Sequence, residues 1–450
     1  MLDFLTAQLL VSVTLFAVMV HVILGAAGYF TYAERKISAY IQDRIGPNRT
    51  GFDLGLPFLK FLKGPRLLGL GQPLADGLKF LVKEDYTPHN VDKVLFTLAP
   101  AIVVIPALIG FAVIPWGGLL ELPTFTIPII NHTVQGGIVE VAALPVNVGV
   151  IYLVAIGSLG VYGVTLGGWA SNNKYSFLGG LRATAQMIAY ELPLGISLLC
   201  VVVLVGSLLP LDIIRYQMEN GWLILSQPIA AVIFFIAALA EANRAPFDNA
   251  EAEQELVGGF HTEYCSMRFA LFFLAEYAHL ATSAAFFALL FLGGFQAIPG
   301  VADPFTSPEA TGVLAVLAKI GVFMGKVVAI VLFMMLVRWT LPRMRYDQVM
   351  STAWQGLIPI SLVVLVATAI AVYFGVPTGI AHVALMLGVN LVLAAGIYAV
   401  MTRLPKPRGN HKIQLAGSRF SPLPGERVVT GPRDALALED RPVEGTISTA

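Results

Sequence analysis

The chain has 450 residues, of which 57% are hydrophobic and only 12% are charged, about half the charged share of an average soluble domain. This composition excludes an ordinary soluble protein and indicates a membrane protein. The 28 Lys and Arg residues balance the 28 Asp and Glu residues, so net charge predicts neither nucleic-acid binding nor general attraction to anionic lipid. Two cysteines cannot hold an iron–sulfur cluster, and no two of the seven histidines stand three or four residues apart, so we predict no metal site.

Nine apolar runs of roughly 20 residues predict an all-α, polytopic membrane protein with about nine spans. The runs cover residues 8–33, 94–116, 144–168, 188–209, 223–240, 269–293, 313–340, 356–375 and 379–401. No basic residue precedes the first run, unlike the start of a secretory signal, so we expect it to remain as the first helix. We predict a helical membrane domain over 1–401 and a charged, Pro-rich tail over 402–450, disordered or bound to a partner.

Basic residues are distributed unevenly between the segments that join the runs. If the N-terminus lies outside, 25 of the 28 Lys and Arg residues fall in inside segments and one, Arg215, in an outside segment. The positive-inside rule therefore predicts an outside N-terminus and a cytoplasmic C-terminus.

The long inside segment 34–93 contains a helical apolar pattern. Leu74, Leu78 and Leu81 fall on one face of residues 72–84, and charged residues occupy the other positions. This pattern predicts an amphipathic helix that lies in the membrane interface.

Ionisable residues inside or at the ends of the spans are candidates for function, because they are costly in lipid. Glu191, Glu241 and Glu276 belong to this class, although Glu191 and Glu241 stand near predicted helix ends and could act only as caps. Lys319 and Lys326 share one face of the seventh run. We expect Lys319 to extend toward the interface and Lys326 to have a buried carboxylate partner.

The cytoplasmic loop 241–268 is acidic, against the positive-inside expectation. It places six carboxylates with two arginines: Glu241, Asp248, Glu251, Glu253, Glu255 and Glu263 with Arg244 and Arg268. The pattern fits a solvated face and equally a set of carboxylates that raise one another's proton affinity for proton uptake or a redox-linked switch.

The segment after the first run combines cations with a Gly-Pro-Asn turn. Its distinctive residues are Glu34, Arg35, Lys36, Arg44, Gly46, Pro47 and Arg49. Such cations commonly anchor a helix at the headgroups, which is the alternative to a binding role.

Taken together, these motifs resemble the membrane H-subunit family of bacterial respiratory complex I, the NADH-quinone oxidoreductase, which is the counterpart of subunit 1 of mitochondrial NADH dehydrogenase. The resemblance covers most of the chain. It rests on an ordered set of motifs in residues 33–49, 72–77, 182–195, 241–264, 269–277 and 338–347.

The resemblance implies a subunit that joins the membrane arm to the hydrophilic arm and forms much of a quinone chamber. The substrate would be ubiquinone or menaquinone. NAD, FMN and the iron–sulfur clusters would belong to partner subunits of the hydrophilic arm, and other membrane-arm subunits and lipid would adjoin the chain. No catalytic residue is then expected in this chain alone, and its location would be the bacterial cytoplasmic membrane.

The resemblance also assigns roles to individual residues. It implies a quinone site near Arg35, Arg44, Phe247, Asp248 and Arg268. It implies a proton-coupling path through Glu191, Glu241 and Glu276, approached by Glu251, Glu253, Glu255 and Glu263, and a structural loop with Glu34, Lys36, Gly46, Pro47 and Arg49. Because quinone reduction takes up two protons, we hypothesise that charge at the quinone changes the protonation of coupled carboxylates from Asp248 through Glu241 to Glu191.

Some features depart from the family pattern. Residues 50–71 include about a dozen more residues than many relatives have, Ser158 stands where some relatives have a carboxylate, and the ninth run and tail exceed the shorter members. Rival interpretations are the related membrane subunit of an energy-converting hydrogenase or of an oxidoreductase with another electron donor, and a self-contained ion transporter. The complete acidic loop and the 34–49 segment favour the quinone enzyme, and the absence of an inverted repeat disfavours the transporter.

Overall fold

The computed structural model describes residues 6–52, 67–127, 132–299 and 303–403. Helices dominate these residues, which confirms the predicted all-α fold of a multi-pass membrane protein. The chain divides into a unit of residues 1–394 and a second unit of residues 395–450, of which 395–403 are described as the end of a helix. The predicted tail and most of the 50–71 segment lie outside the described residues.

The first half of the chain contains α1 (Ala7–Ile41), η2 (Leu67–Gly69), α2 (Gln72–Val82), α3 (Lys93–Ile109), η3 (Gly110–Val113), β1 (Leu119–Leu122), β2 (Phe125–Ile127), β3 (His132–Val134), β4 (Gly137–Glu140), α4 (Gly149–Ala170) and α5 (Lys174–Val205). The second half contains α6 (Pro210–Asn220), α7 (Leu223–Ser226), α8 (Pro228–Glu241), α9 (Glu253–Leu256), η4 (Gly259–His261), α10 (Ser266–Phe291), α11 (Val313–Thr340), α12 (Tyr346–Ser351), the π-helical turn η5 (Thr352–Leu357), α13 (Ile358–Tyr373) and α14 (Ile380–Arg403). Within the described residues, eight stretches are long and apolar enough to cross a membrane: α1, α3 with η3, α4, α5, α10, α11, α12 through α13, and α14.

The predicted fifth span, residues 223–240, is not one continuous helix. It divides into α7 and α8 at Gln227, whose φ of −129° is not helical. Pro228 has no N–H, so the helical hydrogen bonds cannot continue across this point. The 14 residues of α8 rise only about 21 Å, less than the hydrocarbon thickness of a bilayer.

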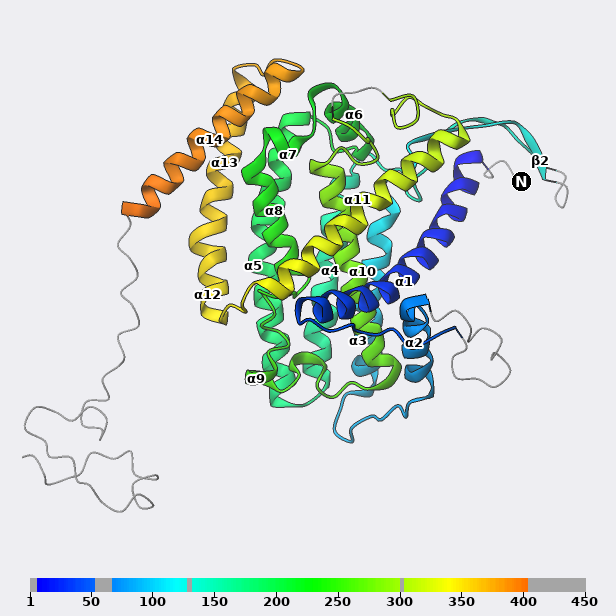
Figure 1. The fold of residues 1–450 in the computed structure, drawn as a ribbon, viewed down its shortest axis with the longest axis vertical. Helices are drawn as coiled ribbons and strands as arrows, with labels where there is room; N and C mark the ends of the chain where they lie inside the picture. Colours follow the sequence, from blue (N-terminus) through cyan, green and yellow to red (C-terminus); the bar gives the residue numbers. More distant parts are fainter. Residues whose placement is uncertain (1–5, 53–66, 128–131, 300–302, 404–450) are drawn as a thin grey trace, which may run out of the picture. The chain divides into compact units, whose positions relative to one another are not determined.

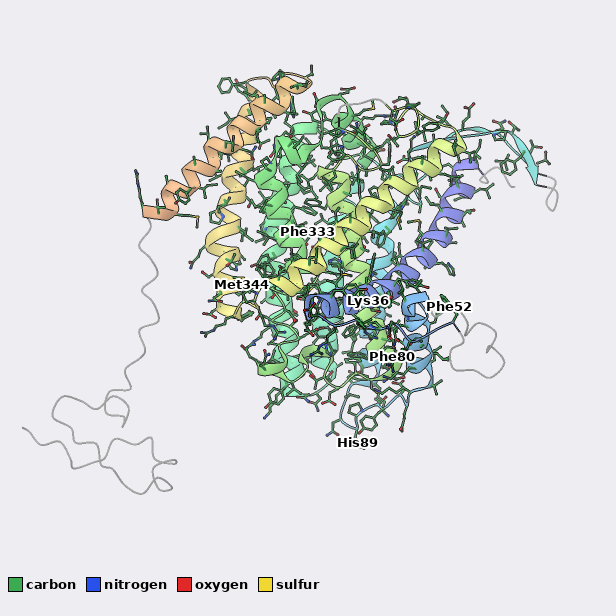
Figure 2. The ribbon with its side chains drawn as sticks, in the orientation of Figure 1. Lys36, Phe52, Phe80, His89, Phe333 and Met344 are labelled. Atoms are coloured by element: carbon green, nitrogen blue, oxygen red, sulfur yellow. The ribbon has the colours of Figure 1, made fainter. Side chains whose placement is uncertain are left out.

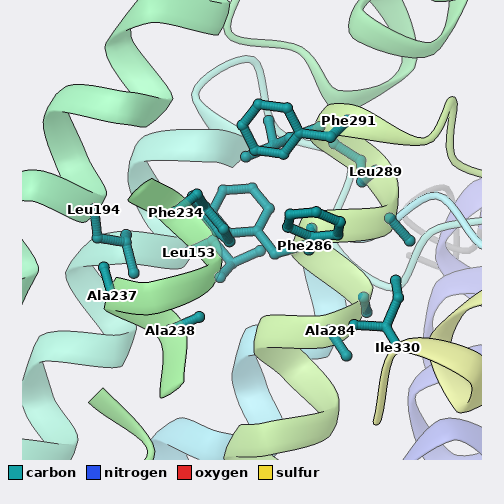
Figure 3. Close-up of a cluster of buried hydrophobic side chains, with 14 of the residues drawn as sticks. Leu153, Leu194, Phe234, Ala237, Ala238, Ala284, Phe286, Leu289, Phe291 and Ile330 are labelled. Carbon is teal, nitrogen blue, oxygen red and sulfur yellow. The ribbon is translucent and has the colours of Figure 1, made fainter. Parts of the chain in front are cut away.

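Helices α3, α4, α5, α8 and α10 pack side by side, with α13 against α5, and α11 crosses them diagonally in the view of Figure 1. Large aromatic side chains fill the space between α8 and α10. Phe234 meets Phe286 and Phe291 at ring-centre distances of 5.6 and 5.7 Å, as Figure 3 shows. These edge-on contacts fix the position of α8, which ends at Glu241.

Several helices extend beyond the predicted runs. Helix α1 continues to Ile41, so Glu34, Arg35 and Lys36 stand on a helix and not in a loop after it. Helix α5 begins at Lys174, which places Glu191 in its middle, so the prediction that Glu191 opens a helix is wrong. Helix α1 extends past the end of its apolar run and α5 begins before the start of its run, so both helices include polar residues.

The loop between α3 and α4 contains two antiparallel hairpins that the sequence patterns did not predict. Strand β1 pairs with β4, Leu120 opposite Val139, and β2 pairs with β3, Thr126 opposite Thr133. The strands have only three or four residues each, too short for an alternating pattern to be recognised.

Lys319 is completely buried, so the prediction that it extends toward the interface is wrong. Its Nζ donates a hydrogen bond to the carbonyl of Ala310 at 2.6 Å and lies 5.2 Å from the ring centre of Phe295. A nearby carbonyl and an aromatic face therefore satisfy this lysine inside the protein.

Lys326 has a buried partner, but the partner is not the predicted carboxylate. Its Nζ donates to the three carbonyls of Leu292, Gly294 and Gln296, at 2.5, 3.0 and 2.5 Å, just beyond the end of α10. It also lies 4.4 Å from the ring centre of Trp222. The lysine thus satisfies carbonyls that the end of α10 leaves without helical partners.

Helix α14 is attached to the broken helix by polar contacts. The Asn390 amide donates to the carbonyl of Ser226, the last residue of α7, at 2.9 Å. Asn220, at the end of α6, accepts from the backbone N–H of Gly379 at 2.9 Å. The carbonyl at the break is therefore satisfied by a side chain from α14.

Candidate functional site

A cavity of about 700 Å³ opens between α1, α2, α10 and α11. Most of its lining is apolar, and it includes Leu24, Ala27, Gly28, Phe80, Leu81, Phe269, Ala270, Phe273 and Leu274. The charged lining consists of Glu34, Arg35, Asp76 and Arg338. The cavity therefore combines long apolar walls with a charged region, as sites for amphipathic organic molecules do.

Helix α2 forms one wall because the predicted apolar pattern does produce a helix, from Gln72 to Val82. Arg35 of α1 pairs with Asp76 of α2 at 2.7 Å, and Gln72 donates to the same carboxylate at 3.0 Å. Gly28 leaves room for Pro73, whose Cβ would stand 3.6 Å from an added Cβ. These contacts hold α2 across the lower half of α1.

Glu34 is buried at the inner side of the cavity and joins three elements. It pairs with Arg338 of α11, accepts a hydrogen bond of 2.5 Å from the Tyr277 hydroxyl of α10, and lies 3.4 Å from Arg244. Arg244 in turn lies 3.4 Å from Glu276 and stacks on Tyr277 at 4.2 Å. A buried carboxylate survives only with such partners, so Glu34 is the centre of an ion cluster and not part of a loop.

Arg244 stays charged in this cluster. Burial acts to lower the pKa of the guanidinium, but Tyr277, Glu276 and Glu34 raise it above the ordinary value. The side chain is only 6% exposed and stands between two carboxylates that face different parts of the protein. A change of charge on either carboxylate is therefore felt by the other through this guanidinium.

The acidic loop continues the cluster beyond Glu276. His261 Nε2 lies 3.1 Å from Glu251 Oε1, and Glu251 also interacts with Glu276. Burial acts to raise the pKa of Glu251, but the hydrogen bond and charge of His261, with Arg244, lower it to about 2. Glu251 is therefore the member of this group that remains ionised.

Asp248 lies beside the same group. Arg343 pairs with it at 2.6 Å, and its second carboxylate oxygen is buried without a hydrogen-bond partner. Burial and the charge of Glu251 raise the pKa of Asp248, and Arg343 opposes this rise.

Two small cavities continue inward from Glu276, with volumes of about 40 and 30 Å³. Glu241, His279 and Gly157 line both, and Glu276 lines the larger one. His279 Nε2 lies 3.5 Å from Glu241 Oε1. Spaces of this size hold a few water molecules at most, and polar partners are present to bind them.

Ser158 lies on α4 next to Gly157, which lines both small cavities. The Ser158 hydroxyl donates directly to the Glu191 carboxylate. An added Cβ on Gly157 would lie only 3.3 Å from Glu241 Oε1. Glu276 and Glu241 therefore share a small cavity, whereas Glu191 adjoins the same part of α4 through Ser158, and a path through all three stays a prediction.

The structure does not gather all predicted quinone-site residues around the 700 Å³ cavity. Of the five, Arg35 lines it. Arg44 is exposed after the end of α1, Phe247 packs on Tyr190 at 5.2 Å, and Arg268 contacts Asp85 and Thr87 at 3.3 and 2.8 Å. Asp248 belongs to the acidic loop. Roles for all five in quinone binding stay predictions.

The remaining predicted acids occupy the loop side. Glu255 pairs with Arg182, and Glu263 accepts from Asn173 at 2.5 Å. Glu253 is the first residue of α9, and the structure describes its backbone only.

The remaining predicted loop residues form the turn after α1. Lys36 is buried and donates to the Ile45 carbonyl at 3.0 Å, and Gly46 has a φ of +71° that favours glycine. Pro47 and Arg49 line a separate polar hollow with Gln72.

Sequence reasoning assigned no role to several residues of the cluster: Asp76, Arg244, Tyr277, His279, Arg338 and Arg343. His279 could have been found, because it stands three residues after Glu276 on the same helical face. The others required knowledge of which helices adjoin, although most of them lie within the quoted motifs. No group of three or more His, Cys, Asp or Glu side chains able to hold a metal occurs in the described ranges.

Comparison with known proteins places this arrangement in a family. The family model for NADH dehydrogenase matches residues 13–369. An NADH-quinone oxidoreductase H subunit of Geobacter sulfurreducens, the one numbered 1, is 44% identical over 362 residues, which cover 79% of this chain and 92% of that protein. This chain belongs to the H-subunit family of NADH-quinone oxidoreductase.

Other relatives of the same name show the same extent of similarity. The H subunit of Leptospira biflexa is 45% identical over 78% of this chain and 92% of its own length, and that of Thermomicrobium roseum is 42% identical over 82% and 98%. All residues of the ion cluster and of the inner cavities fall inside the family match, whereas α14 begins after its end at residue 369. The predicted membership of the H-subunit family is confirmed.

Proposed function

We propose that this chain is the quinone-binding, energy-coupling membrane subunit of a proton-pumping NADH-quinone oxidoreductase in a bacterial cytoplasmic membrane. The observation that carries the proposal is that the 700 Å³ cavity meets a buried ion cluster at Glu34, which in turn connects to the carboxylate route. Electrons would come from partner subunits that hold the NAD site, FMN and iron–sulfur clusters. The quinone is the substrate.

The lining of the cavity fits a quinone. Apolar side chains of α1, α2 and α10 provide a surface for an isoprenoid tail. Arg35 and Arg338, whose guanidinium groups have several N–H donors each, lie near the charged region, and quinone carbonyls accept hydrogen bonds. The cavity lies at a surface of this chain where it is open to lipid or to a partner subunit.

The buried cluster supplies the coupling. Quinone reduction takes up two protons and adds transient negative charge near Glu34. This charge competes for Arg244, which Glu34 shares with Glu276, and so changes the proton affinity of Glu276 and its partner Glu251. Protons then move between Glu276, Glu241 and Glu191 through the two small cavities and Ser158.

The proposed orientation has the N-terminus outside and the C-terminus in the cytoplasm. In Figure 1 the helices of unit 1–394 alternate in direction, and the loops 42–52, 83–92, 171–173 and 242–265 share the lower end. Residues 34–93, which include the first two of these loops, hold ten of the 28 Lys and Arg residues, so the positive-inside rule supports a cytoplasmic lower end.

The first experiment is to purify the chain by an affinity tag in mild detergent and to measure the mass, flavin content and NADH:quinone activity of what accompanies it. We expect a large flavin-containing assembly that reduces quinone with NADH. A chain that runs alone, under conditions that preserve other membrane complexes, would support a self-contained transporter instead. An assembly without flavin or NADH oxidation would support a related oxidoreductase with another donor.

The second experiment tests the cavity itself. Ala270→Phe fills part of the α10 wall, and we expect the KM for quinone to rise about tenfold, since lost binding of about 1.4 kcal/mol corresponds to that factor. Val13→Phe is the control, because Val13 is exposed on α1 away from this cavity. An unchanged KM in an assembled Ala270→Phe enzyme would contradict quinone binding here.

A further inference from the structure

His261 has no part in the function proposed above, yet it is built into the end of the carboxylate group. It lies on η4, in the loop between α8 and α10, with Nε2 at 3.1 Å from Glu251 Oε1. The rings of Phe260, Phe269 and Phe273 surround the imidazole at centre distances of 5.1, 5.2 and 6.2 Å. These aromatic contacts fix the orientation of the imidazole ring and point its Nε2 toward the Glu251 carboxylate.

The carboxylate that His261 contacts interacts with a second one. Glu251 and Glu276 of α10 act on each other, and Arg244 acts on both. Two carboxylates that are coupled in this way are stabilised when they share a proton. His261, Glu251 and Glu276 therefore form a continuous line of groups that can exchange protons, from a cytoplasmic loop into a spanning helix.

Other charges act on this line from every side. Arg244, after α8, faces both carboxylates and remains cationic, whereas Asp248 adds negative charge near Glu251 and Glu276. Histidine is the side chain that ordinarily changes charge between about pH 5 and 8, so it can both receive and give a proton at cytoplasmic pH.

We propose that His261 exchanges protons between the cytoplasmic loop surface and the Glu251–Glu276 pair, and so supplies protons to the coupling route. The imidazolium transfers its Nε2 proton to Glu251 Oε1 when the proton shared with Glu276 leaves toward the inner cavities. The imidazole is then neutral, and a proton from water on the loop side restores the cation. This inference rests on the proposed function and adds the point at which protons enter.

The test compares His261→Asn with wild-type enzyme in sealed vesicles, by the initial rates of proton translocation and NADH oxidation from pH 6 to 8. Asparagine retains a hydrogen-bond donor for Glu251 but cannot carry a proton. We expect proton translocation to fall about tenfold or more at pH 8 and less at pH 6, where protons are more abundant in water. Added imidazole is expected to restore part of the rate.

The matched control is His89→Asn. His89 is exposed in the loop between α2 and α3, contacts Asn90 at 3.1 Å, and lies at the lower end of the helices in Figure 2. We expect its pH profile to equal that of the wild type. Flavin content per chain reports assembly, and His261→Gln serves as the second variant if His261→Asn does not assemble.

The outcomes separate this inference from the proposed function. If the non-titrating variants match the wild type at every pH, His261 is only a hydrogen-bond donor and the inference is wrong, even while Ala270→Phe still raises the KM for quinone. If imidazole does not restore a lost rate, the loss is structural and the inference is also wrong. If the purified assembly does not reduce quinone, the proposed function itself fails.

Discussion

Two regions of this molecule have similar charged side chains but cavities of very different volume. The cavity between α1, α2, α10 and α11 has about 700 Å³, whereas the two spaces between Glu276 and Glu241 have about 40 and 30 Å³. Both contain carboxylates beside basic side chains. The first can admit an organic molecule and the second only water, so under the proposed function the ion cluster at Glu34 is where the substrate stops and only protons continue.

The ion pairs of the two regions differ in burial as well. The pair of Arg35 and Asp76 at the cavity has an arginine that is 53% exposed, whereas Arg244 is 6% exposed between Glu34 and Glu276. Exposed pairs contribute about 0–1 kcal/mol, and removal of one partner of a buried pair costs about 3–5 kcal/mol. The contrast shows that the outer pair adjusts the position of α2, while the inner cluster is required for the packing.

Arg244→Met provides the largest test of this contrast. Loss of the guanidinium leaves two buried carboxylates without their shared cation, so we expect a destabilisation of about 3–5 kcal/mol and poor assembly. Arg35→Met is the matched control, expected to change stability by about 1 kcal/mol or less. Thermal unfolding of the purified assemblies measures both, and equal effects would remove the distinction between the regions.

Glu241→Gln tests whether the inner region carries protons. The amide keeps the shape and the contact with His279 but cannot titrate, so we expect proton translocation to fall about tenfold or more. Vesicle acidification measured with NADH oxidation gives the ratio of protons to electrons. Glu219→Gln, at an exposed glutamate of α6, is the control. Full pumping with full quinone reduction in Glu241→Gln would refute the coupling route.

Gly157→Ala tests the volume of the inner region with a single methyl group. The added Cβ would lie 3.3 Å from Glu241 Oε1 and occupy space that both small cavities share. We expect translocation to fall about threefold, with no change in the KM for quinone, because displaced water lengthens the proton path. Gly321→Ala, at an exposed position of α11 that lines neither small cavity, meets no atom within 4 Å and should leave both quantities unchanged. A changed KM for quinone would show that the small inner cavities also affect binding in the 700 Å³ cavity.

Asn390→Leu should give the smallest effect. It removes the hydrogen bond from α14 to the Ser226 carbonyl, which we expect to destabilise the assembly by about 1 kcal/mol, the scale of polar contacts between membrane helices. Quinone KM and the ratio of protons to electrons should not change, since this contact belongs to neither region. Leu391→Ala, at an exposed position of α14, is the control for loss of side-chain volume. An altered ratio would show that α14 acts on the coupling route.

The sequence identified some of these residues but not how they combine. Glu241 and Glu276 were found because an ionisable group near or inside an apolar run is costly without a purpose. The link from Glu276 to Glu34 through Arg244 was not found, because Arg244 and Glu276 are more than 200 positions from Glu34 and only helix packing brings them together. A local sequence pattern shows that a charge lies where it is costly, but it does not identify the residue that pairs with that charge.

The helix predictions failed where a local backbone feature is not visible in the apolar content of the sequence. The run 223–240 is apolar apart from Ser226 and Gln227 near its start, but Pro228 divides it because the ring lacks an N–H. The short hairpins β1–β4 and β2–β3 give no periodic signal at all. Lys319 was misjudged because its satisfaction depends on Ala310, whose position is set by the loop before α11.

The contact of Lys326 with the end of α10 has a consequence for how the chain enters the membrane during synthesis. A lysine in the middle of α11 makes insertion of that helix into lipid unfavourable on its own. The carbonyls of Leu292, Gly294 and Gln296 that receive it belong to residues translated earlier. We therefore expect α10 and α11 to leave the translocon together, because the carbonyls that follow α10 provide hydrogen-bond acceptors for Lys326 of α11.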